Sequence, residues 1–251
     1  DVAMVERGLA ESRQKAQAVI MAGSVFVDGQ RVDKPGTAVP NTAAIQVRGH
    51  ALPYVSRGGL KLEKAMQTFP LTLDGKVCAD IGASTGGFTD CMLQNGATKV
   101  YAVDVGYGQL DWKLRGDPRV VCMERTNARY LTHEQIPEEL DFASVDVSFI
   151  SLRLILPALD GLLSPEGEAV CLVKPQFESR PDETERGVVR DEAVRRRTVD
   201  EVRAALADAG FDATGVVESP ITGPEGNVEY LVRAVFEGSR DDGGRGEGGR
   251  S

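Results

Sequence analysis

The sequence predicts an α/β fold: a seven-stranded, mainly parallel sheet with helices on both faces, preceded by a small α+β unit. From Leu60 to about Phe236, short apolar segments alternate with amphipathic ones, which is typical of a parallel sheet covered by helices. Only the segment PITGPEGN separates the last two predicted strands, so the last strand is expected to be antiparallel. Residues 1–47 carry capping and hairpin signals of their own, which indicates a separate small unit.

The small unit (1–47) is predicted to contain two helices and a short sheet. A first short helix is followed by a second one, which Ser12 caps and Gly23 ends. Asp28-Gly29 stands between alternating apolar residues and predicts a tight hairpin. The stretch VPNTAAIQV predicts a further strand.

The main domain is expected to span residues 60–237. Its strands are predicted at 77–82, 99–105, 120–125, 142–148, 168–174, 213–218 and 228–236. Among its helices the clearest is 191–209, because Asp191 caps it and Gly210 closes it. A linker is expected at 48–59, where Gly and Pro interrupt the pattern, and a disordered tail at 238–251, which has six glycines and no apolar residue.

Composition narrows the class of protein. The net charge is −9, yet residues 1–64 hold nine Lys or Arg against six Asp or Glu, so only the front of the chain suits a polyanion. No apolar run approaches the roughly 18 residues of a membrane helix and no secretory signal opens the chain, so a cytoplasmic protein is expected. Reduced, buried thiols are expected at Cys78, Cys91, Cys122 and Cys171. Two scattered histidines, His50 and His133, make a metal site unexpected.

The stretch CADIGASTGGFTD (78–90) predicts a ligand site, because a strand, a glycine turn and a helix in this order form a cradle at the carboxyl edge of a parallel sheet. Ser84 stands where a dinucleotide fingerprint needs its second glycine, and no Gly-Lys-Ser/Thr phosphate loop follows. Asp104 ends the next strand, where a carboxylate can accept hydrogen bonds from both hydroxyls of a ribose. S-adenosylmethionine, a nucleoside joined to an amino acid without phosphate, fits best; the alternative is that the glycines only turn the chain.

Six segments carry a resemblance: GASTGGFTD, AVDVGYGQL, ERTNAR, DVSFISL, VKPQFE and GNVEYL, in this order behind a small basic unit. They resemble the TlyA family of ribosomal RNA 2′-O-methyltransferases, relatives of the FtsJ group that are often called hemolysins. The resemblance runs from about residue 1 to 236. It implies a Rossmann-like methyltransferase domain behind an S-four-like RNA-binding domain, which starts here inside its first helix.

The activity that the resemblance implies is transfer of a methyl group from S-adenosylmethionine to the ribose 2′-hydroxyl of a cytidine in ribosomal RNA. The implied partner is ribosomal RNA within the large subunit, and in some members also the small subunit. Loss of this methyl group is linked in the family to resistance to capreomycin-type antibiotics. Three alternatives stay open: a membrane-active hemolysin, a non-catalytic RNA-binding protein on the same fold, and methylation of a base.

The resemblance implies a catalytic tetrad of Lys61, Asp146, Lys174 and Glu229. Asp146 and Lys174 also sit at the carboxyl ends of predicted strands, at the rim where such sheets bind ligands, so position alone indicates function for them. For Lys61 and Glu229 position alone favours an ordinary surface ion pair. Lys174 is expected to orient the hydroxyl and stabilise alkoxide charge, with Lys61 assisting and the two acids holding both lysines. General-base action by Lys174 stays open, because burial favours the neutral amine whereas the acids favour the ammonium ion.

Binding residues are expected in both the main domain and the small unit. The cofactor residues implied by the resemblance are Asp80, Gly82, Ser84, Gly86, Gly87, Phe88, Thr89, Asp104, Asn127 and Asp146. Phe149 can pack on an adenine, although an aromatic residue after a strand is more often part of the core. The candidate phosphate contacts, each of which is almost as well explained as a solvated polar residue, are Arg7, Arg13, Gln14, Lys15, Arg31 and Lys34.

Overall fold

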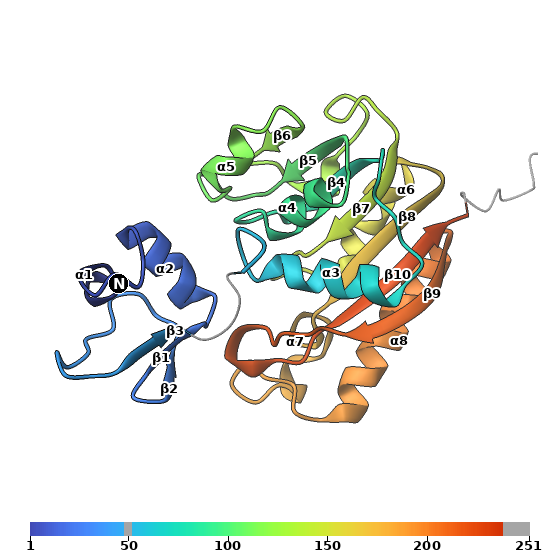
Figure 1. Cartoon of the computed structure of the whole chain (residues 1–251). Coiled ribbons are helices and arrows are strands. Elements are labelled where there is room, and N and C mark those ends of the chain that lie inside the picture. The colour runs from blue at the N-terminus through green and yellow to red at the C-terminus, as the bar shows by residue number, and fades with distance from the viewer. Residues whose placement is uncertain (48–51, 238–251) are drawn as a thin grey trace, which may run out of the picture.

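The computed structural model describes residues 1–47 and 52–237, which form a small unit and a larger α/β domain (Figure 1). The predicted tail (238–251) and the middle of the predicted linker (48–51) lie outside the described residues.

The small unit has the predicted α+β composition. Its elements are α1 (Val2–Glu6), α2 (Arg13–Met21), β1 (Val25–Val27), β2 (Gln30–Val32) and β3 (Ile45–Val47). The strands form an antiparallel sheet in the order β2-β1-β3. The Lys15 amide donates to the Ser12 hydroxyl at 3.2 Å, so the predicted cap is confirmed. Asp28 and Gly29 both adopt positive φ, which a two-residue hairpin turn requires.

The main domain contains one seven-stranded sheet. Its strands are β4 (Val77–Ile81), β5 (Lys99–Val103), β6 (Val120–Met123), β7 (Leu140–Val145), β8 (Leu163–Val173), β9 (Phe211–Glu218) and β10 (Tyr230–Phe236). They lie in the order β6-β5-β4-β7-β8-β10-β9. The first five are parallel, whereas β10 is antiparallel to both β8 and β9. The predicted sheet with an antiparallel last strand is confirmed.

Helices cover both faces of this sheet (Figure 1). They are α3 (Gly58–Thr68), α4 (Gly87–Gln94), α5 (Trp112–Arg115), α6 (Leu156–Asp160), α7 (Pro175–Glu178) and α8 (Glu192–Asp208), with short 3-10 turns η1 (Ala128–Tyr130), η2 (Leu152–Leu154), η3 (Pro181–Glu183) and η4 (Pro224–Gly226). The cap at Asp191 is confirmed, because its carboxylate accepts from the Ala193 amide at 2.8 Å.

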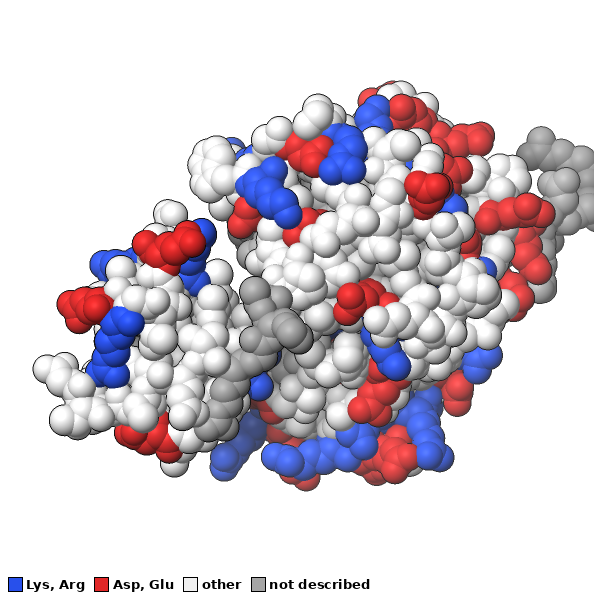
Figure 2. Space-filling view, in the orientation of Figure 1, with Lys and Arg blue, Asp and Glu red and all other residues white. Residues whose placement is uncertain are grey.

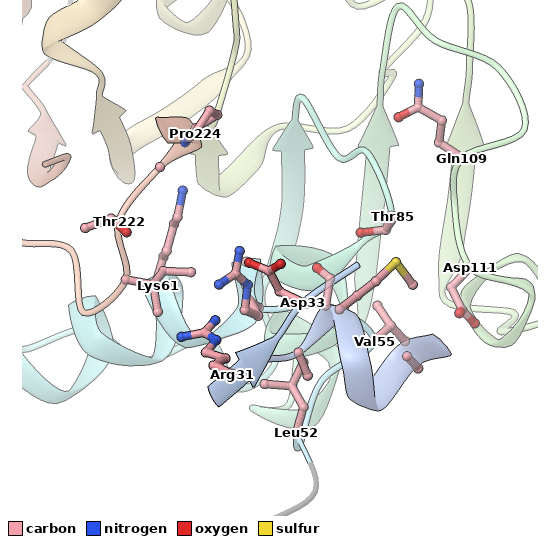
Figure 3. Close-up of a pocket in the computed structure, with 18 of the residues that line it drawn as sticks. Arg31, Asp33, Leu52, Val55, Lys61, Thr85, Gln109, Asp111, Thr222 and Pro224 are labelled. Atoms are coloured by element: carbon pink, nitrogen blue, oxygen red, sulfur yellow. The ribbon is translucent and has the colours of Figure 1, made fainter. Parts of the chain in front are cut away.

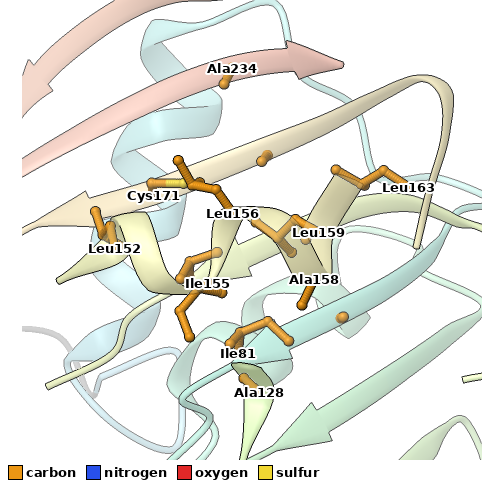
Figure 4. Packing of buried hydrophobic residues seen from close by; sticks show 14 of the residues in the cluster. Ile81, Ala128, Leu152, Ile155, Leu156, Ala158, Leu159, Leu163, Cys171 and Ala234 are labelled. Atoms are coloured by element: carbon orange, nitrogen blue, oxygen red, sulfur yellow. The ribbon is translucent and has the colours of Figure 1, made fainter. Parts of the chain in front are cut away.

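Two apolar cores result from the alternation of side chains along each strand. On one face α3, α4 and α5 pack over Cys78. On the other face α6 and α8 pack over Ala79 and Ile81. Figure 4 shows this second core, where α6 lies close to Ile81 and Cys171. Successive residues of β4 thus fix both helical layers.

The order of the strands places a topological switch point beside β4. The chain passes from β4 to β5 on one side and returns later to β7 on the other, so the sheet changes winding direction between β4 and β7. Ligands of doubly wound sheets bind at the carboxyl ends of such strands. The glycine turn follows β4 and Asp146 follows β7, so both lie at this point.

The structure corrects the predicted ends of several strands and the predicted burial of one cysteine. β5 and β7 end two or three residues earlier than predicted, because Asp104 and Asp146 belong to the loops at the rim. β8 begins earlier, at Leu163, since a bulge lets its first part pair with β7. Cys122 was expected to be buried but is exposed, because β6 is the edge strand.

Candidate active site

The glycine turn after β4 is built for close approach of backbones. Gly82 and Gly86 have φ values of 89° and 94°, which side chains rarely tolerate. A Cβ atom at Gly82 would lie 2.3 Å from the Asp146 carbonyl oxygen, and one at Gly86 would lie 2.2 Å from the Leu114 side chain. The two glycines therefore let the turn lie directly against the end of β7 and against α5.

Asp80 lies behind this turn and not at its surface. Its side chain accepts hydrogen bonds from the Thr89 amide at 2.8 Å, the Thr89 hydroxyl at 2.7 Å and the Ser144 hydroxyl at 3.0 Å. Burial raises the pKa of Asp80 to about 6, although these hydrogen bonds oppose the shift. Asp80 therefore fixes the start of α4 and the turn, and any effect on a ligand passes through that backbone.

This burial predicts a pH-dependent stability. An unfolded aspartate loses its proton near pH 4, whereas folded Asp80 keeps it to about pH 6. Since the folded state binds more protons in this window, Asp80 makes the free energy of unfolding fall as pH rises from about 4 to about 6. Asp80→Asn keeps the shape and removes this titration. Urea unfolding should show Asp80→Asn gaining about 1 to 3 kcal/mol relative to the native protein between these pH values. A difference that does not change with pH would contradict the prediction.

Asp104 occupies the rim beside the turn. Its carboxylate accepts from the Ser84 amide at 2.7 Å and from the Gly106 amide at 2.6 Å. The backbone of the following loop is joined to the segment after β6, because the Thr126 amide donates to the Asp104 carbonyl at 2.9 Å. This places exposed Asn127 beside the Asp104 loop, where its side chain caps η1.

The four residues of the implied tetrad come together at the carboxyl edge of the sheet. Lys174 Nζ lies 2.5 Å from one Asp146 oxygen, and Lys61 Nζ lies 3.9 Å from the other. Lys61 also donates to Glu229 at 2.7 Å. Glu229 is 1% exposed and each lysine 8%. The result is a continuous chain of charges, Glu229–Lys61–Asp146–Lys174, in which both lysines and Glu229 are buried and the Asp146 side chain is 22% exposed.

Two neutral partners of this cluster were not predicted from the sequence. Lys174 donates to the Ser148 hydroxyl at 2.9 Å, and Gln176 donates from Nε2 to Glu229 at 3.2 Å. Each stands two positions after a charged residue that directly follows a strand, in DVS and KPQ. A search for polar residues at that spacing would have identified both.

A cleft of about 1030 Å³ opens beside Lys61, between the main domain and the small unit. Figure 3 shows Lys61 near Thr222 and Pro224, with Arg31 of the small unit nearby. Thr85 of the glycine turn also lines this space. The cleft thus reaches from the small unit to the charged cluster and the turn.

The remaining predicted residues divide by exposure. Phe88 and Thr89 are buried, so they support the turn from behind. Phe149 is 86% exposed with φ of 66° and lies 5.2 Å from the Phe177 ring, so the suggestion that it belongs to the core is wrong. Gly87 is buried against Ser56.

The basic residues of the small unit have mixed surroundings. Arg7 donates to the carbonyls of Ala43 and Asn41, whereas Arg13 forms an exposed ion pair with Asp1. The other four residues are exposed. Lys15 pairs with Glu11, and Lys34 follows β2. Gln14 and Arg31 line the cleft. On the face drawn in Figure 2, acidic and basic side chains are interspersed over both units. Exposed pairs of this kind contribute little to stability and can exchange for phosphate groups.

Within the described part of the chain, no three His, Cys, Asp or Glu side chains are arranged to hold a metal ion. None of the helices in residues 1–47 and 52–237 combines the length and hydropathy of a membrane span.

Comparison of folds defines the class of protein. An S-adenosylmethionine-dependent methyltransferase from Mesorhizobium loti superposes with a TM-score of 0.52 at 17% identity, over 70% of this chain and 97% of that one. Similarity at this level concerns the fold alone, and the fold is that of the Rossmann-like methyltransferases.

Closer relatives define the family. Residues 54–236 match FtsJ-like methyltransferase and residues 1–42 match the S4 domain. "Putative rRNA methyltransferase YqxC" of Bacillus subtilis is 51% identical over 97% of this chain and 87% of its own length. 16S/23S rRNA (cytidine-2′-O)-methyltransferase TlyA of Mycobacterium tuberculosis is 49% identical over 92% and 87%. A solved structure named "Putative hemolysin", from Streptococcus thermophilus, is 46% identical with a TM-score of 0.77, over 96% and 89%. This chain belongs to the FtsJ-like methyltransferase family, in its TlyA group, with an S4 domain in front.

Proposed function

We propose that the protein transfers a methyl group from S-adenosylmethionine to the ribose 2′-hydroxyl of a cytidine in ribosomal RNA. The observation that carries this proposal is the largely buried chain of charges Glu229–Lys61–Asp146–Lys174 beside the glycine turn, in a protein whose relatives include a cytidine-2′-O-methyltransferase. Two ammonium groups held at one rim suit a reaction in which a sugar oxygen gains negative charge.

The residues at the turn fit S-adenosylmethionine as the methyl donor. Residues 80–90 contain no Lys or Arg that would hold a phosphate, and the turn exposes Ser84 and Thr85 beside Asp104. Asp104 would hold the ribose, since each of its oxygens can accept more than one hydrogen bond. Asn127 and the backbone at Gly82 and Ser84 would complete the site. When bound, the cofactor supplies an electrophilic methyl group on its sulfonium.

Lys174 is placed to act on the acceptor oxygen. An ammonium group has three donors, and Asp146 and Ser148 engage two of them. The third can donate to the 2′-hydroxyl oxygen, which aligns it and stabilises the charge that develops there. Lys61 would assist from the cleft side, where it lines the cavity, while Asp146 and Glu229 hold both lysines.

The S4 domain would hold the RNA substrate through its phosphates. Arg7, Arg13, Gln14, Lys15, Arg31 and Lys34 are the proposed contacts, and such contacts make affinity depend on salt more than on sequence. The target nucleotide would have to leave its stack before its ribose reaches Lys174. The proposed partner is therefore ribosomal RNA within a ribosomal subunit.

The decisive experiment uses purified protein, isotopically labelled S-adenosylmethionine and separated ribosomal subunits that lack the modification. Nuclease digestion and mass spectrometry should find the label in 2′-O-methylcytidine. Label on a base, or on protein only, would contradict the proposal. Dye release from liposomes without cofactor would instead support the hemolysin that some relatives are named for.

Asp104→Asn tests the assignment of the ribose site. It replaces a charged acceptor with an amide, and hydrogen bonds to charged groups contribute about 1.5 to 3 kcal/mol. Titration calorimetry should show the Kd for S-adenosylmethionine rising about 10- to 100-fold. Asp117→Asn is the control, because Asp117 pairs with Arg119 away from the turn. An unchanged Kd in Asp104→Asn would remove Asp104 from the site.

A further inference from the structure

Asn227 lies two residues before Glu229 and is almost fully buried, with 3% of its surface exposed. The hydrogen bonds of its side chain go to Gly187, Val189 and Pro224, which are not among the four charged residues. Its side-chain amide instead joins the loop that contains Gly187 and Val189 to the turn from Gly223 to Asn227, and this turn packs against Glu229.

This amide makes three hydrogen bonds, and both of its N–H donors are used. Its Nδ2 donates to the carbonyls of Gly187 at 2.9 Å and Pro224 at 3.0 Å, and its Oδ1 accepts from the Val189 amide at 3.1 Å. Two carbonyls and one N–H around the same group also fix which way the amide faces. The Gly223 amide donates to the Asn227 carbonyl at 2.8 Å, which closes the turn.

Both loops contain backbone that needs an anchor. Arg186 and Gly187 have positive φ in the first loop, and Glu225 and Gly226 have positive φ in the second. Non-glycine residues in this conformation cost on the order of 1 kcal/mol each and persist only where the surroundings hold them. The buried Asn227 amide stabilises both segments through its hydrogen bonds to their backbones.

The turn in its present position supports the Glu229 carboxylate. A Cβ atom at Gly223 would lie 2.1 Å from Glu229 Oε1, so the backbone of the turn packs directly against this oxygen. Gln176 donates to the same oxygen, while Lys61 donates to the other one at 2.7 Å. Movement of the turn would therefore free Glu229 to leave Lys61.

We propose that Asn227 is a positioning residue: by fastening the turn at 223–227 to the loop at 187–189, it holds Glu229 against Lys61. Residues 221–226 also line the cleft that Lys61 faces, so the same amide fixes one wall of that cleft. Any effect of Asn227 on catalysis rests on the proposed methyl transfer. Its effect on the contact between Glu229 and Lys61 does not.

The structural consequence is measured by the reactivity of lysine side chains. Reductive methylation with formaldehyde, quantified residue by residue by mass spectrometry, should label Lys61 about tenfold faster in Asn227→Ala, equivalent to local opening made easier by about 1.4 kcal/mol. Lys76, which pairs with Glu168 at 2.9 Å at the opposite edge of the sheet, should keep its rate. Asn95→Ala removes an amide that donates to the Cys91 carbonyl far from the cleft, and should change neither lysine. An unchanged Lys61 rate, or equal acceleration of both lysines, would overturn the proposal.

A second variant disturbs the contact between the turn and Glu229 without changing Asn227. Gly223 has φ of −73°, which alanine tolerates, so Gly223→Ala disturbs chiefly the Glu229 oxygen. It should also accelerate labelling of Lys61, and a native rate would overturn the link between the turn and Glu229. If Asn227→Ala does not fold, Gly223→Ala still tests whether the turn at 223–227 holds Glu229 against Lys61.

The catalytic consequence is tested by a double-mutant cycle. Asn227→Ala should lower kcat for RNA methylation on the order of tenfold with an unchanged Kd for S-adenosylmethionine, and should cost little further in a Glu229→Gln background. Costs that add would assign Asn227 to general stability. Failure of the native protein to methylate RNA would refute the proposed function, but the labelling result would still decide the role of Asn227.

Discussion

Lys174→Ala is expected to lower the rate of ribose methylation about 100- to 1000-fold, the usual effect of removing one group that stabilises a developing oxyanion. Lys174 donates to Ser148 and contacts Asp146 at 2.5 Å, so its ammonium group is held at the rim of the sheet. The measurement is single-turnover transfer of labelled methyl to ribosomal subunits, with affinity for S-adenosylmethionine followed by calorimetry. That affinity should change little, because Lys174 is assigned to the acceptor oxygen.

Lys76→Ala is the matched control. It removes another partly buried lysine that pairs with a carboxylate, at the amino end of β4 and therefore away from the rim. Its turnover should stay native. Near-native turnover of Lys174→Ala would refute the assignment of Lys174.

Lys174→Arg separates the two roles left open for this side chain. Arginine keeps the positive charge but cannot accept a proton at neutral pH. If Lys174 stabilises charge, Lys174→Arg should retain clearly more activity than Lys174→Ala. Equal loss in both variants, with cofactor affinity intact, would favour proton transfer to the amine.

Sequence predicts best those site residues whose position depends on one strand and the loop that follows it. A charged residue directly behind an apolar strand has to emerge at the rim of a parallel sheet, so Asp146 and Lys174 were placed by pattern alone. The glycine turn was predictable for a similar reason, since the order of strand, glycines and helix is local in the chain. These features depend on short-range geometry.

Lys61 and Glu229 could not be placed in this way. They are separated by 168 positions and meet only because β10 inserts between β8 and β9 while α3 packs across the sheet. Sequence pattern indicates that β10 is antiparallel, but the insertion depends on tertiary packing. The resemblance to a family supplied this pair, and the structure supplied its geometry.

The same limit explains the residues that were missed or misjudged. Asn227 acts through two loops whose contact is not local, so no spacing identifies it. Cys122 was expected inside because its strand is apolar, yet a strand at the edge of a sheet leaves part of its surface open. Phe149 follows β7 with a positive φ that turns it outward, which no alternation of apolar residues predicts.

Glu229→Ala is expected to cause the largest loss of stability, about 3 to 5 kcal/mol, because it leaves a buried ammonium group without its partner. Lys61 is 8% exposed, and after the change the one ion pair left to it among the described residues would be that with the Asp146 oxygen at 3.9 Å. Urea unfolding measures the loss. Glu201→Ala is the control, since Glu201 forms exposed ion pairs with Arg153 and Arg197 that should contribute about 1 kcal/mol or less.

A double variant separates stability from catalysis at this pair. Lys61→Met combined with Glu229→Leu removes both charges and fills a similar volume, and such replacements of buried ion pairs are often neutral or stabilising. Its free energy of unfolding should return close to the native value, whereas RNA methylation should stay low because Lys61 no longer assists the sugar oxygen. If methylation returned together with stability, the pair would be a structural element only. Equal destabilisation in Glu229→Ala and Glu201→Ala would mean that water from the cleft solvates Lys61, and would contradict the expected cost of a buried unpaired charge.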